Sequence, residues 1–315
     1  MDQIKVLLSA IEKKIENISL KYLRTQSSNL IKKYRTFRKF NLTYDEKISY
    51  ITFRMPATFK AIEYCLNQLK NLQLNTKINT VLDLGSGPGT ALYAYLSVFK
   101  SFDKMTLVER DTEFVQISKD LSKDIKELKK VFFVQMDLIA YKDYDHDLII
   151  VSYVLNELKI YQIDKILKNF IKSKAKVIVF IEPGTKYGFN NIRYLHDKII
   201  KNDLKIIAPC PNNFKCPMPK DDWCHFFVRL DRSKCHKYIK KGTLSFEDEK
   251  FSYLIVTKKD SKPYKARVLL NPKKKDSKML LNLCQDGKVF QNQIDKKDLK
   301  NYKISKKIKW GDIIK

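Results

Sequence analysis

The sequence is poor in glycine, arginine and tryptophan. It holds 8 glycines and 2 tryptophans in 315 residues, and only 9 of its 62 basic residues are arginine. No apolar run approaches the roughly 20 residues that a membrane-spanning helix needs, so no membrane partner is expected. Asp2, Glu12 and Glu16 stand among the first lysines, which argues against a secretory signal or an acid-poor transit peptide. The expected location is a reducing cytoplasm, in which cysteines are thiols or metal ligands rather than disulfides.

Positive charge is what the chain has in excess, with a formal net charge of +27. A preference for lysine over arginine, with many Asn and Ile residues, is typical of an AT-rich genome, and it weakens charge as evidence for a partner. The charge is nevertheless uneven, because residues 258–315 hold 18 Lys and Arg against 6 Asp and Glu. A basic segment of this kind indicates a nucleic acid partner.

Hydrophobic periodicity divides the chain into three expected regions. Residues 1–75 place apolar side chains at three- and four-residue spacing, which predicts a helical region. In residues 76–257, short β-branched runs alternate with amphipathic patterns. The runs are TVLDLG, KMTLVE, KVFFVQM, DLIIVSYV and AKVIVFIE, and the amphipathic patterns, which predict helices, lie near 90–99, 112–128, 156–172 and 188–202. This alternation predicts an α/β domain with a mostly parallel sheet and helices on both faces. Residues 258–315 predict a basic β extension, in which Asp286-Gly287 marks a hairpin turn.

Three of the eight glycines fall in one turn, VLDLGSGPGT at residues 81–90, between a predicted strand and a predicted helix. Gly85 permits a tight turn, Gly87 lets a ligand approach the backbone, and Gly89 lets the helix pack on the strand. Ser86 lies between the first two. The N–H groups at the start of the helix can then bind an anionic group of the ligand. All four residues are predicted to bind a cofactor.

Acidic residues at the ends of three successive predicted strands identify the cofactor. Asp83 precedes the glycine turn, where an acid would repel a phosphate but could pair with an ammonium group. Glu109 lies 20 residues after the last glycine of the turn, where an acid can accept from ribose hydroxyls. Asp137 ends the third strand and could accept from an adenine amino group. The P-loop ending Gly-Lys-Ser/Thr is missing, so the sequence predicts S-adenosylmethionine rather than a nucleoside triphosphate.

A proline-rich loop at residues 208–226 contains Cys210, Cys216 and Cys224. Thiolates are soft ligands that suit iron–sulfur clusters and zinc. The gaps between these cysteines are wider than those of zinc knuckles, and a stiff irregular loop can wrap a bulky cluster, so iron–sulfur is favoured and zinc is the alternative. A fourth ligand is then needed.

The residues alone leave the fourth ligand open between Cys235, close in sequence, and Cys284, before the predicted hairpin turn. Cys65 sits in an apolar helical pattern and is expected in the core. His225 or His236 could replace a cysteine in a zinc or mixed site.

No catalytic residue can be assigned. The Asn/Asp-Pro-Pro-aromatic turn of amino-methylating enzymes is missing after the fourth strand, and no nucleophilic cysteine lies near that rim. Tyr153, Asn156 and Glu157 could line the mouth of a methyl-transfer site, although Asn156 could equally stand near the cap of the next helix.

The chain resembles one family over roughly residues 50–312. The motifs that carry the resemblance are RMPATF (54–59), VLDLGSGPGTAL (81–92), VSYVLNEL (151–158), EPGT (182–185), APCP (208–211), DWCHF (222–226), EDEKFSYL (247–254) and KWGD (309–312). The family comprises the methyltransferase-like proteins of small-ribosomal-subunit assembly, known from mitochondria and with bacterial relatives. The resemblance therefore implies a bacterial cytoplasm, or a mitochondrion for a eukaryotic source. The resemblance implies a class I methyltransferase (Rossmann-like) fold, S-adenosylmethionine, and rRNA of the small subunit or its precursor as partner.

The same resemblance implies a 4Fe–4S cluster on four cysteines, which match Cys210, Cys216, Cys224 and Cys284, and so a C-terminal β extension tied by metal to the main domain. Two functions are expected from the family. One is an rRNA methyltransferase, and the other is a non-catalytic assembly factor that binds rRNA.

Overall fold

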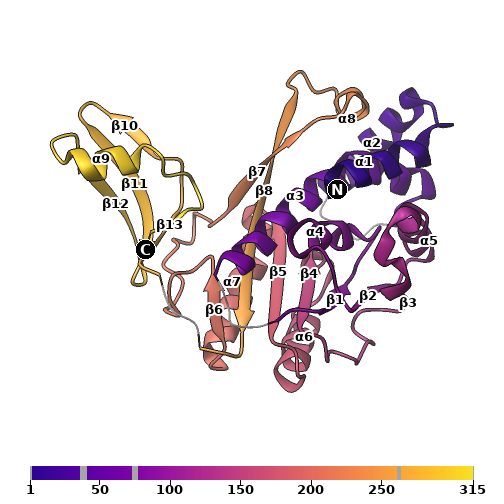
Figure 1. The fold of residues 1–315 in the computed structure, drawn as a ribbon, viewed down its shortest axis with the longest axis horizontal. Coiled ribbons are helices and arrows are strands. Elements are labelled where there is room, and N and C mark those ends of the chain that lie inside the picture. The colour runs from indigo at the N-terminus through magenta and orange to yellow at the C-terminus, as the bar shows by residue number, and fades with distance from the viewer. Residues whose placement is uncertain (1, 36–40, 73–76, 261–263, 315) are drawn as a thin grey trace. The chain divides into compact units, whose positions relative to one another are not determined.

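The computed structural model describes residues 2–35, 41–72, 77–260 and 264–314. The chain divides into two compact units, one of residues 1–175 and 227–249 and the other of residues 176–226 and 250–315. Figure 1 shows the elements of both units. The domain boundaries expected from the sequence differ from this division and remain a prediction.

The first unit contains a bundle of N-terminal helices and an α/β sheet. Its helices are α1 (Gln3–Ile15), α2 (Leu20–Arg35), α3 (Tyr44–Asn71), α4 (Thr90–Phe99), α5 (Thr112–Leu121), α6 (Ile160–Lys172) and α8 (Lys234–Ile239), with short 3-10 turns at Ser122–Asp124, Lys126–Lys130 and Leu155–Glu157. Its strands are β1 (Thr80–Leu84), β2 (Lys104–Glu109), β3 (Val131–Gln135), β4 (Leu148–Ser152) and β7 (Phe226–Asp231). The helices α1 to α3 occupy the segment where the periodicity predicts helices.

The four central strands of the first unit are parallel and follow the order β3-β2-β1-β4, which can be traced from right to left in Figure 1. Val81 on β1 pairs with Met105 on β2 and with Leu148 on β4. Chain order therefore reverses between β1 and β4, and this is the switch point at which doubly wound sheets bind ligands. The predicted fold class, a class I methyltransferase (Rossmann-like) α/β fold, is confirmed.

Burial explains why these segments form a sheet covered by helices. The β-branched and leucine side chains of β1 and β4 are almost all buried, as expected for parallel strands covered on both faces. The helix α4 is buried on nearly every side and packs against α1 and α3. The helix α5 packs against β2, β3 and α1. The N-terminal helices therefore complete the core beside the glycine turn.

The second unit contains two antiparallel groups of strands. Its helices are α7 (Lys186–Lys201) and α9 (Leu299–Ser305); its strands are β5 (Val177–Pro183), β6 (Lys205–Ala208), β8 (Phe246–Thr257, which begins in the first unit), β9 (Ala266–Val268), β10 (Lys273–Lys275), β11 (Lys278–Gln285), β12 (Lys288–Asp295) and β13 (Ile313–Ile314). β5 and β6 both pair with β8, and α7 packs on β5 and β6. β9 to β13 form a separate five-stranded sheet.

The hairpin predicted in the C-terminal extension is confirmed. Gln285 pairs with Lys288 at the end of β11 and β12, and Asp286 and Gly287 between them have φ angles of 48° and 69°. Positive φ at both central residues is the geometry that an Asp-Gly pair favours in two-residue hairpins.

Two helix predictions are wrong at their ends. The periodic pattern from 112 to 128 forms a helix only to Leu121, and 3-10 turns follow it. The pattern from 156 begins as a 3-10 turn, and α6 starts at Ile160 with Lys159 as its cap residue, so Asn156 does not cap α6. Across the described residues, no helix has the length and hydropathy to cross a membrane.

Candidate functional site

The glycine turn closes the carboxyl end of β1 and leads into α4. Gly85, Gly87 and Gly89 have positive φ angles of 72°, 51° and 82°, a region that most side chains disfavour. The N–H groups of Gly85 and Ser86 both donate to the carbonyl of Val108 on β2, at 2.8 and 3.0 Å. The turn is thereby fixed beside β2 at the switch point of the sheet.

The last two glycines of the turn have different surroundings. A Cβ added at Gly87 would have no atom within 4 Å, whereas one added at Gly89 would overlap the Ser118 hydroxyl on α5. Gly87 therefore borders open space, and Gly89 permits close packing of two helices. In the described structure Gly89 stands at the cap position of α4 and makes no side-chain cap hydrogen bond, so no cap side chain occupies the first N–H groups of the helix there.

Glu109 ties the turn to the start of α5. Its Oε2 accepts from the N–H of Gly87 at 2.9 Å, and its Oε1 accepts from the N–H of Asp111 at 2.9 Å. Asp111 in turn caps α5 by accepting from Glu113 and Phe114 N–H groups, both at 3.0 Å. Glu109, which the sequence predicts to accept from ribose hydroxyls, therefore contacts the glycine turn directly.

Asp83 is buried at the end of β1, with a relative exposure of 1%. Burial, together with the nearby Glu109 carboxylate, raises the pKa of Asp83 to about 8. Its Oδ1 is buried and finds no hydrogen-bond partner among the residues that the structure describes. A buried acid that is costly to ionise and has an unsatisfied oxygen matches a cationic ligand group.

Asp137 and Ser86, the other predicted cofactor residues, have only local features. Asp137 is exposed beyond β3, and its Oδ1 accepts from the N–H of Ile139 at 2.8 Å. Ser86 is buried within the turn. Neither residue is shown to contact a ligand, and both assignments remain predictions.

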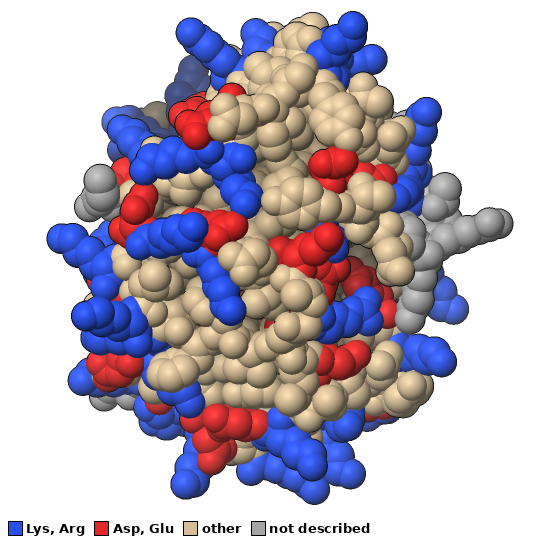
Figure 2. All heavy atoms as spheres, turned by 90° about the vertical axis from the view of Figure 1, so that its right-hand side faces the viewer, with Lys and Arg blue, Asp and Glu red and all other residues tan. Residues whose placement is uncertain are grey.

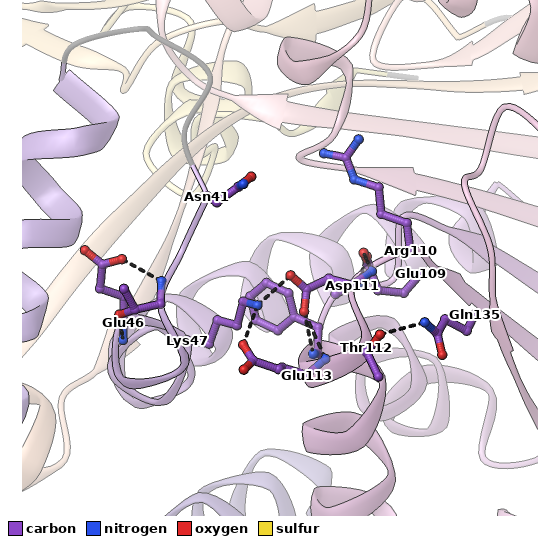
Figure 3. A network of polar contacts seen from close by, with 12 residues as sticks. Asn41, Glu46, Lys47, Glu109, Arg110, Asp111, Thr112, Glu113 and Gln135 are labelled. Carbon is purple, nitrogen blue, oxygen red and sulfur yellow. Dashed lines mark hydrogen bonds and ion pairs between the residues drawn. The ribbon is translucent and has the colours of Figure 1, made fainter.

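Lys47 on α3 joins the N-terminal helices to this region, which the sequence did not predict. Its Nζ lies 2.5 Å from Asp111 and 2.7 Å from Glu113, and it is 5.4 Å from the centre of the Phe114 ring. Figure 3 shows Lys47 pointing toward both carboxylates, with Glu109 just beyond Asp111. A buried lysine with two acidic partners fixes α3 against the start of α5. Local sequence patterns carried no signal for this contact.

Three residues from distant motifs meet beside β4. Tyr153 directly follows β4 and has a φ angle of 59°, which is strained for a tyrosine. Its hydroxyl donates to Glu249 Oε1 at 3.1 Å, and Arg54 makes two hydrogen bonds to the same carboxylate at 2.9 and 3.0 Å. Burial and Glu249 raise the pKa of Tyr153, and Glu249 raises the pKa of Arg54 although burial opposes it. At neutral pH neither Tyr153 nor Arg54 therefore gives up its proton.

The thiols of the proline-rich loop share one cavity in the second unit with a thiol of β11. This cavity is lined by Cys210, Cys216, Cys224 and Cys284, with Arg193, His196 and Arg267 among its polar neighbours. Burial raises the pKa of all four thiols, to about 11 for Cys284. The other three thiols raise the pKa of Cys210 further. A metal bound here would have to displace protons.

The loop that carries three of these thiols is held by backbone carbonyls and aromatic rings. The Trp223 indole N–H donates to the Gly184 carbonyl at 2.9 Å, and the Trp310 indole N–H donates to the His225 carbonyl at 3.1 Å. The His225 ring stacks on Trp223 and meets Trp310 edge-on. The Ser252 hydroxyl donates to the Cys224 carbonyl at 2.7 Å. Segments far apart in the sequence therefore meet around this cavity.

The remaining candidate ligands lie elsewhere. Cys65 is buried within α3, and Cys235 lies on α8 of the first unit, where burial and Glu12 raise its pKa to about 11. The Nε2 atom of His236 is hydrogen-bonded to Oε2 of Glu247 at 3.1 Å. Among the described residues, no group of three or more His, Cys, Asp or Glu side chains is gathered tightly enough to hold a single metal ion.

Two cavity residues were missed by sequence reasoning. His196 on α7 is 3% exposed, and its Nε2 is buried without a partner among the described residues. Arg267 on β9 is fully buried. A lone histidine in an amphipathic helix and a lone arginine in a short strand carry no recognisable spacing, so only the folded chain reveals them.

Comparison with known proteins finds a matching family and several relatives. A family model described as mitochondrial small ribosomal subunit Rsm22 matches residues 44–315. The mitochondrial Rsm22-cox11 tandem protein 2 of Schizosaccharomyces pombe is 23% identical over 334 aligned residues, covering 86% of this chain and 43% of that protein. The mitochondrial ribosome assembly protein METTL17 of Homo sapiens is 24% identical over 238 residues, covering 70% of this chain and 50% of that protein.

The chain thus spans half or less of the length of these two curated relatives. Among solved structures, a precorrin-6y C5,15-methyltransferase of Geobacter metallireducens is 14% identical, covers 62% of this chain and 86% of that one, and has a TM-score of 0.41. Since the family model extends over most of the sequence, from α3 to the C-terminal strand, the chain belongs to the Rsm22 family of the mitochondrial small ribosomal subunit.

Proposed function

We propose that this chain is an S-adenosylmethionine-dependent, methyltransferase-like factor that acts on small-subunit rRNA during ribosome assembly. The partner comes from the family description and from the name of the human relative, a ribosome assembly protein. The observation that carries the cofactor is Asp83, a buried acid beside a glycine turn whose Oδ1 has no partner within the described part of the chain.

S-adenosylmethionine has an ammonium group, a carboxylate, a sulfonium centre and a ribose with two hydroxyls. Asp83 would accept from the ammonium group, and Glu109 would accept from the ribose hydroxyls. The N–H groups at the start of α4 would bind the carboxylate, and Asp137 would accept from the adenine amino group. The bound cofactor supplies an activated methyl group, and the residues of the turn would orient it toward an acceptor.

We further propose a 4Fe–4S cluster on Cys210, Cys216, Cys224 and Cys284. The fit rests on the chemistry of the donors, because four thiols line one cavity and thiolates are the ligands of such clusters. Zinc, which thiolates also bind, is the alternative occupant of these ligands.

An RNA partner is supported by charge in the C-terminal extension. Lys273, Lys274 and Lys275 on β10 are all exposed, and residues 258–315 carry three times as many basic as acidic side chains. Lysine and arginine side chains are also spread over the face in Figure 2, but there they are interspersed with acidic ones. The β extension is therefore the better candidate for contact with phosphates.

Methyl transfer is tested by incubating immature small subunits with tritiated S-adenosylmethionine and the protein. Label in rRNA is expected from the wild type and is expected to be lost with Asp83→Ala. Asp103→Ala, which changes an exposed acid elsewhere in the first unit, is the matched control and should leave the label unchanged. Equal label with Asp83→Ala would contradict the cofactor assignment.

The metal is tested by iron, sulfide and zinc analysis of protein isolated without oxygen. About four iron atoms per chain are expected, and Cys284→Ser should release them while Cys65→Ser should not. Zinc in place of iron would overturn the cluster but keep the ligands. Iron retained by Cys284→Ser would show that the fourth ligand is wrong.

The second candidate is a non-catalytic factor that binds rRNA and uses the cofactor pocket structurally. The network of Tyr153, Glu249 and Arg54 favours this function. These side chains beside β4 hydrogen-bond to one another, which leaves less capacity to bind a methyl-accepting base. In this case the protein would bind S-adenosylmethionine and immature subunits but leave no label in rRNA. The two relatives carry "mitochondrial" in their names, and the same compartment is proposed for a eukaryotic source of this chain.

A further inference from the structure

Arg267 occupies a position that normally excludes charge. It is fully buried and lies in the middle of β9, directly opposite Cys284 on β11. Its neighbours Ala266 and Val268 belong to the small apolar core of the C-terminal sheet. Because side chains alternate along a strand, Arg267 points to the other face, where it lines the cavity of the four thiols. A buried guanidinium is costly, so its place here needs a reason.

The guanidinium is held in a fixed orientation by oxygen atoms of three segments. Its Nε donates to the Pro209 carbonyl at 2.9 Å, its Nη1 to the Gly311 carbonyl at 2.6 Å, and its Nη2 to the Tyr264 hydroxyl at 2.7 Å. Pro209 immediately precedes Cys210. Arg267 therefore stands next to one thiol along the chain and opposite another across the sheet. A planar fork suits such simultaneous contacts better than a lysine ammonium group.

Arg267 places a positive charge in the wall of the cavity that the four thiols line. A cluster held by four thiolates is an anion, and its reduction adds a further negative charge. A fixed cation beside it stabilises the reduced form more than the oxidised form, and local charge and hydrogen bonding are known to set the potentials of such clusters.

We propose that Arg267 is the built-in counter-charge of the cysteine site and the residue that fixes the Cys210 loop to the C-terminal strands. The charge part rests on the proposed cluster. The anchoring part does not, because it concerns contacts that exist in the protein without metal.

Two variants separate charge from anchoring. Arg267→Met removes the charge but keeps an unbranched apolar side chain. Arg267→Lys keeps the charge but lacks the planar guanidinium group with its several N–H donors. Arg232→Met is the matched control, because Arg232 is partly buried on Glu247 in the first unit. The readouts are the cluster midpoint potential, the rate of iron loss to a chelator, and backbone hydrogen exchange of residues 208–226 in the apoprotein.

Arg267→Met is expected to lower the equilibrium constant for reduction of the cluster at least tenfold. For one electron this corresponds to a midpoint potential that is more negative by about 59 mV. Arg267→Lys should retain most of the wild-type potential, and Arg232→Met all of it. Both Arg267 variants should show faster exchange in residues 208–226, because each loses bonds to the Pro209 and Gly311 carbonyls. A wild-type potential in Arg267→Met would overturn the charge part. Unchanged exchange in both variants would overturn the anchoring part.

If Arg267→Met holds no cluster, the rates of iron loss decide. Arg267→Lys is then expected to keep its iron, and equally complete loss from both variants would overturn the role of charge. If the wild type itself holds no iron, the cluster proposal fails and the charge part with it. The exchange experiment on apoprotein still tests the anchor, so the two failures are distinguishable.

Discussion

Asp83 leads to a prediction about the pH dependence of cofactor binding. Its pKa of about 8 in the ligand-free protein means that the carboxyl group is mostly protonated at neutral pH. An ammonium group can pair only with the carboxylate form. Binding of S-adenosylmethionine is therefore expected to displace a proton from Asp83 at any pH below 8.

The size of the effect follows from linkage. Well below pH 8 the dissociation constant should fall about tenfold for each unit of rising pH, and it should level off above pH 8. The gain in affinity from pH 6 to pH 8 is then about 50-fold, which is worth about 2.3 kcal/mol of binding free energy. About one proton should leave for each cofactor bound at pH 6.5. The folding stability of the protein without cofactor changes with pH in the opposite direction. Between pH 3.8, the ordinary pKa of an Asp, and about pH 8 the folded state binds more protons than the unfolded state. The contribution of Asp83 to stability therefore falls with rising pH, by up to about 6 kcal/mol over that window.

Titration calorimetry in two buffers of different ionisation enthalpy measures the protons released. Asp83→Asn should release none and bind more weakly, with a flat pH profile, and its unfolding free energy should fall less between pH 4 and pH 8. Asp103→Asn should match the wild type. A wild type that binds equally well at pH 6 and pH 8 with no proton release would refute the assignment of Asp83 to the ammonium group.

Three further outcomes are expected. Gly89→Ala should lower the urea midpoint more than Gly87→Ala, since positive φ costs about 1–2 kcal/mol at either position but only the first adds a clash with Ser118; equal midpoints would contradict this. Loading of a cluster should quench the emission of both tryptophans, because Trp223 and Trp310 flank the loop that holds the thiols; full iron content with unchanged emission would contradict the site. Affinity for small-subunit rRNA should drop steeply between about 50 and 200 mM salt, and a flat profile would argue against lysine–phosphate contacts.

The strand runs and the glycine turn were predictable because their signals are local. β1 to β5 fall on the β-branched runs, and the Asp286-Gly287 turn has the geometry that this pair favours. The placement of Asp83 and Glu109 beside the turn also followed from strand ends, since parallel strands present their carboxyl ends at one edge. Element ends such as that of α5 were less predictable, because the amphipathic pattern continues into the 3-10 turns that follow.

The contacts that complete both sites could not be predicted. Arg54 and Glu249 are 195 positions apart, and nothing in either segment identifies the other as its partner. Arg267 and Cys284 meet only because β9 pairs with β11 in one particular register. Such contacts depend on the fold as a whole, whereas periodicity and turn chemistry report only on neighbouring residues.

The contact between Arg267 and the Gly311 carbonyl has a consequence for biosynthesis. A ribosome that makes about 5–20 residues per second needs roughly 5–20 s to travel from Cys210 to Gly311. During that interval the thiols of the proline-rich loop are already exposed on the nascent chain, while the C-terminal strands that bury them have not yet been synthesised. Insertion of the proposed cluster would therefore have to follow translation of Gly311, and cells short of reductant would damage newly made copies before mature ones.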